Sequence, residues 1–121
     1  MDARLREGIN LFNERRFFES HEALEALYQE TEAANKPFIE GLIQVAAAFR
    51  IFSEFAEVNG PVRMIYQALI RFESYQPDFL QVRVRELSAA LESWAKQAQA
   101  AGNAAPGTSI PKISLQRFGL F

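Results

Sequence analysis

The chain has 121 residues, of which 49% are hydrophobic and 23% are charged. This length fits one domain with a sizeable core, and the composition excludes disorder over most of the chain. Because there is no cysteine and only one histidine, His21, disulfide scaffolds, thiolate metal sites and sites with two histidines from one chain are excluded. A net charge of −2 with only local basic pairs argues against nucleic acid as a partner.

The sequence shows no membrane span and no export signal. The amino-terminal stretch is charged, and the longest apolar stretch, residues 41–49, contains Gln44 and is too short to cross a bilayer. We therefore expect a soluble cytoplasmic protein with no membrane partner.

Apolar residues recur every three or four positions through most of the chain, which predicts helices. Prolines and glycines divide the chain into five predicted helices, at residues 2–14, 17–33, 36–58, 61–75 and 79–100. Pro37 and Pro61 suit a first helical turn, where a missing N–H is tolerated. The residues expected to cap helix N-termini are Asn35, Asn59 or Gly60, and Asp78.

The second predicted helix carries the most informative pattern. At about 100° per residue, His21 and Glu25 fall on the face that also carries aromatic and leucine side chains, and Glu22 lies at its edge. A core-facing histidine and carboxylate without partners would cost several kcal/mol. We therefore expect them to pair with each other or to share a bound ion or a polar neighbour.

The third predicted helix is apolar nearly all round, which is typical of a central helix. Glu40 and Gln44, one turn apart, interrupt this pattern, and Gly41 with the alanines at 46–48 should let another helix approach closely. We expect a buried polar cluster, with Glu22 at its rim, formed by His21, Glu25, Glu40 and Gln44.

Three interpretations of this cluster stay open. It is a structural polar network, or a metal-free acid–base pair in which Glu25 orients His21, or a divalent metal site. For the metal site the candidate ligands are His21, Glu22 and Glu25, with Glu40 and Gln44 holding the ligands or a water. Such a donor set suits Mn²⁺, Fe²⁺ or Mg²⁺ better than structural zinc, and the candidate ions are Mn, Fe, Mg or Zn. Because position 25 is Glu, the H-E-x-x-H zinc motif is excluded.

The last twenty residues are rich in Gly, Pro, Ala and Ser. The alternation at Ile113 and Leu115 predicts an extended strap on the helices, with an arm to a partner subunit as the alternative. We predict a helical domain at 1–101 and a tail at 102–121 that packs on the bundle or on a partner subunit. A homodimer would use surplus aromatic residues, with these candidates: Trp94, Phe118 and Phe121.

Two motifs together resemble the family catalogued as domain of unknown function 309. The first is Phe-Phe-Glu-x-His-Glu-x-x-Glu-x-x-Tyr at residues 17–28, and the second is Phe-x-x-Gly-Leu-Ile-Gln-x-Ala at residues 38–46. The resemblance extends over residues 7–76. It implies a small all-helical bundle, and the family has been grouped with predicted metal-dependent hydrolases. The motif positions carried over are Phe18, Glu19, His21, Glu22, Glu25, Gly41 and Gln44.

We therefore expect an all-α fold, a bundle of about five helices with an extended C-terminal strap. Two function classes stay open. One is a metal-dependent, hydrolase-like enzyme with His21, Glu22 and Glu25 as catalytic residues. The other is a non-catalytic helical protein-interaction or ligand-binding domain in which the His/Glu/Gln network is structural. The sequence does not indicate a substrate.

Overall fold

A computed structural model describes residues 1–101 and 109–117. Five α-helices, two short 3-10 turns and a terminal extended segment make up these residues, which confirms the all-α prediction. The helices are α1 (Ala3–Asn13), α2 (Phe17–Glu30), α3 (Lys36–Phe55), α4 (Asn59–Phe72) and α5 (Val84–Ala101). The 3-10 turns are η1 (Ala33–Asn35) and η2 (Glu73–Tyr75).

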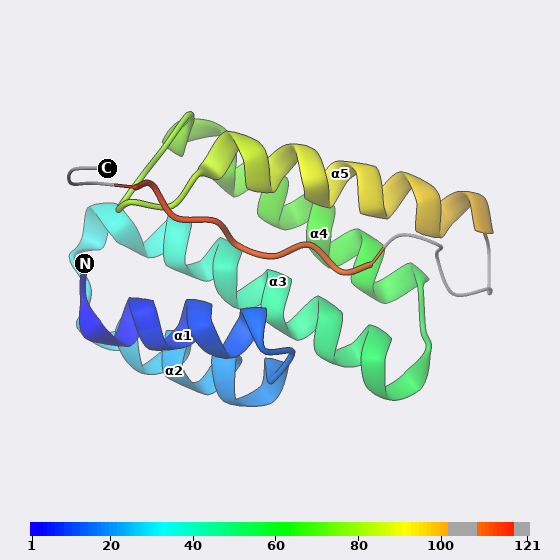
Figure 1. The fold of residues 1–121 in the computed structure, drawn as a ribbon, viewed down its shortest axis with the longest axis horizontal. Coiled ribbons are helices and arrows are strands. Elements are labelled where there is room, and N and C mark those ends of the chain that lie inside the picture. The colour runs from blue at the N-terminus through cyan, green and yellow to red at the C-terminus, as the bar shows by residue number, and fades with distance from the viewer. Residues whose placement is uncertain (102–108, 118–121) are drawn as a thin grey trace.

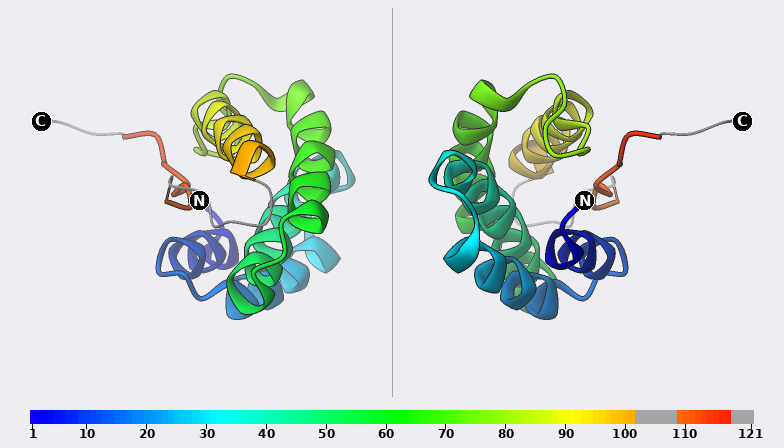
Figure 2. Two further views of the ribbon diagram at one scale, coloured as in Figure 1. Left: turned by 90° about the vertical axis from the view of Figure 1, so that its right-hand side faces the viewer. Right: turned by 90° about the vertical axis from the view of Figure 1, so that its left-hand side faces the viewer.

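Each helix packs against the next helix in the sequence. Figure 1 shows them running back and forth, and the end-on views of Figure 2 show an arc with α1 and α5 at its ends. α3 lies between α2 and α4, and Phe38 and Phe49 on it are 0% exposed, as expected of a central helix. Trp94 of α5 is also 0% exposed, with its ring 4.9 Å from that of Phe49. The prediction that Trp94 lies at a subunit interface is therefore wrong.

Two glycines allow helices to approach closely. A Cβ atom built on Gly41 would lie 2.6 Å from Cε1 of Phe72, and one built on Gly8 would lie 2.7 Å from Cδ2 of Leu24. The expected close approach at Gly41 is confirmed, and the helix that approaches is α4.

The fifth helix begins later than the predicted residue 79. Residues 79–82 form a tight turn in which Phe79 and Val82 exchange two backbone hydrogen bonds, so α5 starts at Val84. Leu80 and Gln81 occupy this turn with positive φ angles of 48° and 69°. Asp78 precedes the turn, so the prediction that it caps the last helix is wrong.

The other helix ends differ from prediction by a few residues. Asn35 directly precedes α3, but its side chain makes no capping hydrogen bond, and α4 already begins at Asn59. The cap that the structure does show was not predicted: Oδ1 of Asp2 accepts a hydrogen bond from the Arg4 N–H at 2.8 Å. α3 ends at Phe55, where Ala56 adopts a left-handed conformation.

Residues 109–117 form an extended segment, the strap, that crosses the open side of the arc (Figures 1 and 2). Its Ile113 is 3% exposed, and the backbone N–H and carbonyl of Ile113 both bond to the side chain of Asn13. The backbone N–H of Arg83 donates to Ser114, and that of Gln116 donates to Gln81. The strap therefore ties α1 to the 79–82 turn. Two of the predicted interface residues, Phe118 and Phe121, lie outside the described residues.

Candidate functional site

His21 and Glu25 lie one turn apart on the outward side of α2. Nε2 of His21 is 3.7 Å from Oε1 of Glu25, and the two side chains are 32% and 47% exposed. The expectation that they are buried is wrong. The inward face of α2 is instead formed by four residues spaced by three or four positions: Phe17, Ser20, Leu24 and Leu27.

Ser20 is the polar side chain that the α2 interface buries. It is 0% exposed, and its Oγ donates a 2.7 Å hydrogen bond to the carbonyl of Gly8 on α1. The sequence reasoning missed Ser20 because it centred the buried face on aromatic residues, including Phe18, which is 45% exposed. The spacing of Ser20 from Phe17, Leu24 and Leu27 is the signal that identifies the inward face.

Glu40 and Gln44 bond to side chains of α4. Nη2 of Arg71 lies 3.4 Å from Oε1 of Glu40, and Nε of Arg71 donates to Oε1 of Gln44 at 3.0 Å. Nε2 of Gln44 in turn donates to Gln67 at 3.2 Å. The expected buried cluster of four residues is therefore divided, with one pair on α2 and the other pair held by α4.

The side chains in the described ranges do not fit a metal site with three protein donors. Within residues 1–101 and 109–117, no three His, Asp or Glu side chains are grouped closely enough to hold an ion. His21 and Glu25 form a pair, Glu22 is exposed, and Glu40 is engaged by Arg71. Metal binding at His21, Glu22 and Glu25 stays a prediction that needs a direct measurement.

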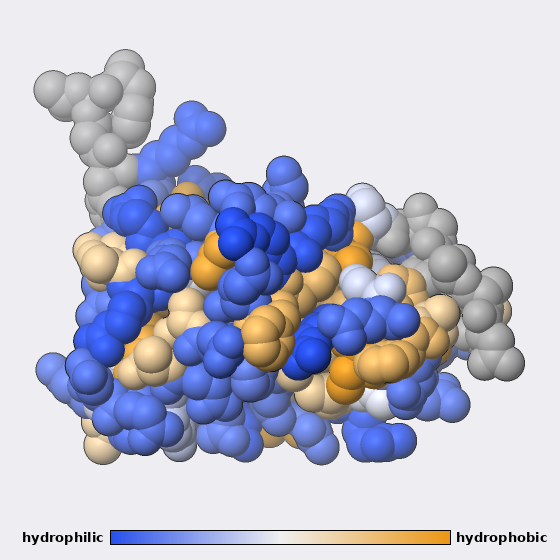
Figure 3. All heavy atoms as spheres, turned by 90° about the horizontal axis from the view of Figure 1, so that it is seen from below, coloured by the Kyte–Doolittle hydropathy of each residue, from blue (hydrophilic) through white to orange (hydrophobic). Residues whose placement is uncertain are grey.

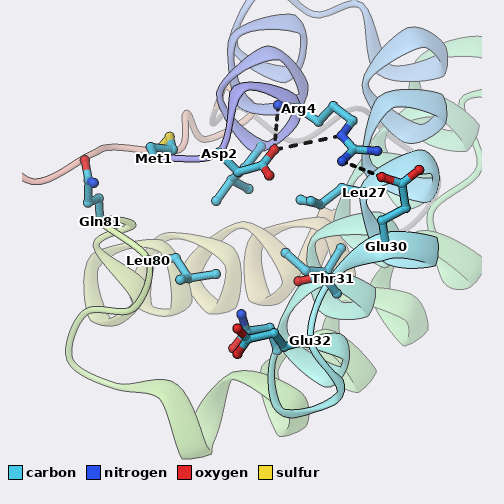
Figure 4. A pocket seen from close by; sticks show the side chains of 12 residues that line it. Met1, Asp2, Arg4, Leu27, Glu30, Thr31, Glu32, Leu80 and Gln81 are labelled. Atoms are coloured by element: carbon cyan, nitrogen blue, oxygen red, sulfur yellow. Dashed lines mark hydrogen bonds and ion pairs between the residues drawn. The ribbon is translucent and has the colours of Figure 1, made fainter.

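A pocket of about 410 Å³ opens at one end of the bundle, and we call it the end pocket. Figure 4 shows its lining, which comes from the starts of α1 and α3, the end of α2, the segment after α2, and the 79–82 turn. The lining residues are Met1, Asp2, Arg4, Leu5, Leu27, Glu30, Thr31, Glu32, Asn35, Ile39, Leu80 and Gln81.

One side of the end pocket is formed by an ion-paired group. Nη2 of Arg4 lies 2.8 Å from Oε2 of Glu30, and Nε of Arg4 lies 4.0 Å from Oδ1 of Asp2 (Figure 4). The hydrogen bond from Arg4 lowers the pKa of Glu30 below its ordinary value, and the same bond raises the pKa of Arg4. Arg4 is therefore already committed to two carboxylates.

The rest of the lining combines an apolar floor with a strained turn. Leu5, Leu27 and Ile39 form the floor and are at most 4% exposed. Leu80 adds an aliphatic side chain that is 37% exposed from a left-handed backbone conformation, which ordinarily favours glycine or asparagine. The strap bonds to the carbonyl of the adjacent Gln81 and so supports this turn.

The sequence reasoning did not find the end pocket. Its lining residues come from separate segments and form no short motif, so no local spacing in the sequence identifies them.

The face seen from below in Figure 1 carries hydrophilic and hydrophobic residues. In Figure 3 the hydrophobic residues gather mainly on one half of this face, with hydrophilic residues between them. Phe18, at the start of α2, is exposed, and the guanidinium of Arg50 lies 4.5 Å from the centre of its ring. Within the part of the chain that the structure describes, no helix combines the length and the apolar character needed to cross a membrane.

Comparison with known families confirms the resemblance over part of its expected extent. The family model described as domain of unknown function 309 matches residues 5–54, which run from α1 nearly to the end of α3 and end before the expected residue 76. This segment contains both motifs and most of the end-pocket lining. No curated protein matches the chain.

Proposed function

We propose that this protein, whose residues 5–54 match the family model described as domain of unknown function 309, is a non-catalytic ligand-binding domain whose binding site is the end pocket. The observation that carries the proposal is the cavity itself. Its volume of about 410 Å³ lies in the range of small-molecule sites, and both apolar side chains and polar or charged groups line it.

The hydrolase hypothesis has less support from the geometry. It relies on His21 and Glu25, which lie 3.7 Å apart on a solvent-facing helix surface and do not line the end pocket. A metal-assisted hydrolase holds its ion on several protein donors and keeps an open position for the water that it activates. The polar residues of α3 that were expected to complete this site are bonded to α4.

The proposal is tested by nuclear magnetic resonance with ¹⁵N-labelled, tag-free protein and a library of neutral, cationic and anionic fragments. We expect binding fragments to shift the backbone amides of Leu27, Thr31 and Glu32. Thr31→Phe, which fills part of the cavity, should abolish these shifts. Gln29→Phe adds the same ring on the exposed surface of α2, outside the lining, and should leave them unchanged.

If no fragment shifts these amides, or if Thr31→Phe binds as well as the wild type, the end pocket is not a ligand site. Elemental analysis of the same preparation, purified without chelator, tests the competing hypothesis. Near-stoichiometric Mn, Fe or Zn that is lost in His21→Ala would favour a metal site on α2 over the proposed function.

A further inference from the structure

Resting on the proposed function, we propose that the end pocket selects a small organic cation, with an ammonium or guanidinium head on an apolar stem. Three features of the lining support this inference: its charged groups, the partners that those groups already have, and its apolar residues.

The charged groups of the lining leave a small excess of negative charge. Asp2, Glu30 and Glu32 carry carboxylates, whereas the positive groups are the guanidinium of Arg4 and the amino-terminal ammonium of Met1. Arg4 is paired with Glu30 at 2.8 Å, so it has little to offer an incoming anion. The end of α2 adds the partial negative charge of its last backbone carbonyls, since α2 stops at Glu30.

Glu32 is the acidic group available to a ligand. Within residues 1–101 and 109–117 its carboxylate has no hydrogen-bond or ion-pair partner. Lys36, one turn later in the sequence, does not neutralise it, because its Nζ lies 4.5 Å from the centre of the Tyr28 ring. In Figure 4, Glu32 lies across the pocket from the Arg4–Glu30 pair, with Thr31 between them. A cationic head beside Glu32 would therefore form a second pair of opposite charges in the pocket, across from the Arg4–Glu30 pair.

The apolar part of the lining requires more than a bare ion. Leu80, which is 37% exposed on the facing turn, and the half-buried Met1 present apolar side chains that a hydrated metal ion or ammonium cannot use, whereas Leu5, Leu27 and Ile39 beneath them are almost fully buried. An alkyl or aromatic stem would cover this surface and gain from leaving water. The lining thus fits a single molecule that carries both a cationic head and an apolar stem.

The test compares three six-carbon probes of similar shape: hexylammonium, 1-hexanol and hexanoate. Each is titrated into ¹⁵N-labelled, tag-free protein at fixed ionic strength, and the amide shifts of Leu27, Thr31 and Glu32 give the Kd. We expect hexylammonium to bind roughly two- to fivefold more tightly than hexanol, since pairs of exposed charges contribute modestly. Hexanoate should bind more weakly than hexanol.

Glu32→Gln should bring the Kd of hexylammonium close to that of hexanol, and higher salt should do the same without weakening hexanol binding. Glu57→Gln removes an exposed carboxylate outside the lining and should leave the preference unchanged. Glu32 is exposed in the segment between α2 and η1, so we expect Glu32→Gln to fold like the wild type. An unchanged melting temperature checks this.

The outcomes separate the two proposals. If hexanol or hexanoate binds as tightly as hexylammonium, or if Glu32→Gln keeps the preference, the cation proposal is overturned while the pocket remains a ligand site. If none of the probes shifts these amides, both proposals fail. N-acetyl-lysine methylamide presents the same head as a protein side chain. Binding tighter than that of hexylammonium would favour a lysine of a partner protein as the source of the cation, and weaker binding would favour a free amine.

Discussion

Two parts of the molecule differ in how closely their side chains pack. Between neighbouring helices, Gly8 and Gly41 bring side chains so near that an added methyl group would collide with Leu24 or Phe72. At the end pocket, charged groups are exposed and two residues of a turn adopt left-handed conformations. The helix contacts are therefore closely packed, whereas the end pocket has a Glu32 carboxylate without a partner among the described residues and two left-handed residues in its turn.

The largest effect is expected at the closest helix contact. Gly41→Ala should lower the free energy of unfolding by about 2 kcal/mol, because its Cβ would lie 2.6 Å from the ring of the fully buried Phe72. This is a net loss, because the higher helix propensity of alanine offsets part of the cost of the collision. Urea denaturation measures the change.

Gly60→Ala is the matched control. Its Cβ would lie 2.7 Å from Oε1 of Glu57, but that atom is the end of an exposed, flexible side chain that can rotate away. We expect no loss of stability. Equal stabilities of the two variants would show that the α3–α4 contact is looser than the structure indicates.

The next effect distinguishes two adjacent residues of α2, the buried Ser20 and the partly exposed His21. Ser20→Ala removes a buried hydrogen bond to Gly8 and should lower the free energy of unfolding by about 1 kcal/mol. His21→Ala should change it by less than about 0.5 kcal/mol, because the histidine is on the solvent-facing side and its pairing with Glu25 is long. Thermal and urea unfolding of both variants provide the measurement, and a larger loss in His21→Ala would instead favour a structural network around that residue.

A smaller effect of opposite sign is expected at the end pocket. Leu80→Asn should raise the free energy of unfolding by about 0.5 kcal/mol, because asparagine tolerates the left-handed conformation better than leucine. The same change removes aliphatic surface and should weaken hexanol binding. Ile70→Asn replaces another exposed aliphatic residue, in a helix without such strain, and should not be stabilising. A stability loss in Leu80→Asn would contradict the inference of strain.

The smallest effect concerns the charges of the end pocket. Arg4→Gln should raise the pKa of Glu30 toward its ordinary value, because the hydrogen bond from Arg4 is what lowers it. Since the folded-state pKa of Glu30 lies below its unfolded value, the pair stabilises the wild type at neutral pH. This contribution is present above the ordinary glutamate pKa of about 4.3 and is lost as the pH falls from there through the lower folded-state pKa. Carboxyl ¹³C titration measures the shift. Arg16→Gln should move the pKa of Glu19 and not that of Glu30.

The sequence by itself determined the helical class and the approximate positions of the five helices. These follow from apolar spacing and from proline and glycine, which act within a few residues of chain. It also identified α3 as the central helix and Gly41 as a point of close approach, because an all-round apolar helix with small residues has to be surrounded.

The tertiary structure alone decided which partners the polar residues meet. A helical pattern gives the angle between Glu40 and its neighbours on α3, but it does not say whether that face meets α2 or α4, and Arg71 of α4 proved to be the partner. The pattern also placed His21 on the buried face of α2, whereas the structure buries Ser20 against α1 and leaves His21 partly exposed. The end pocket depends on where α2 stops, where the 79–82 turn reverses and where the strap crosses. These three features bring together segments that are far apart in the chain. The contacts between them are stabilised by packing, which the local spacing of residues does not reveal.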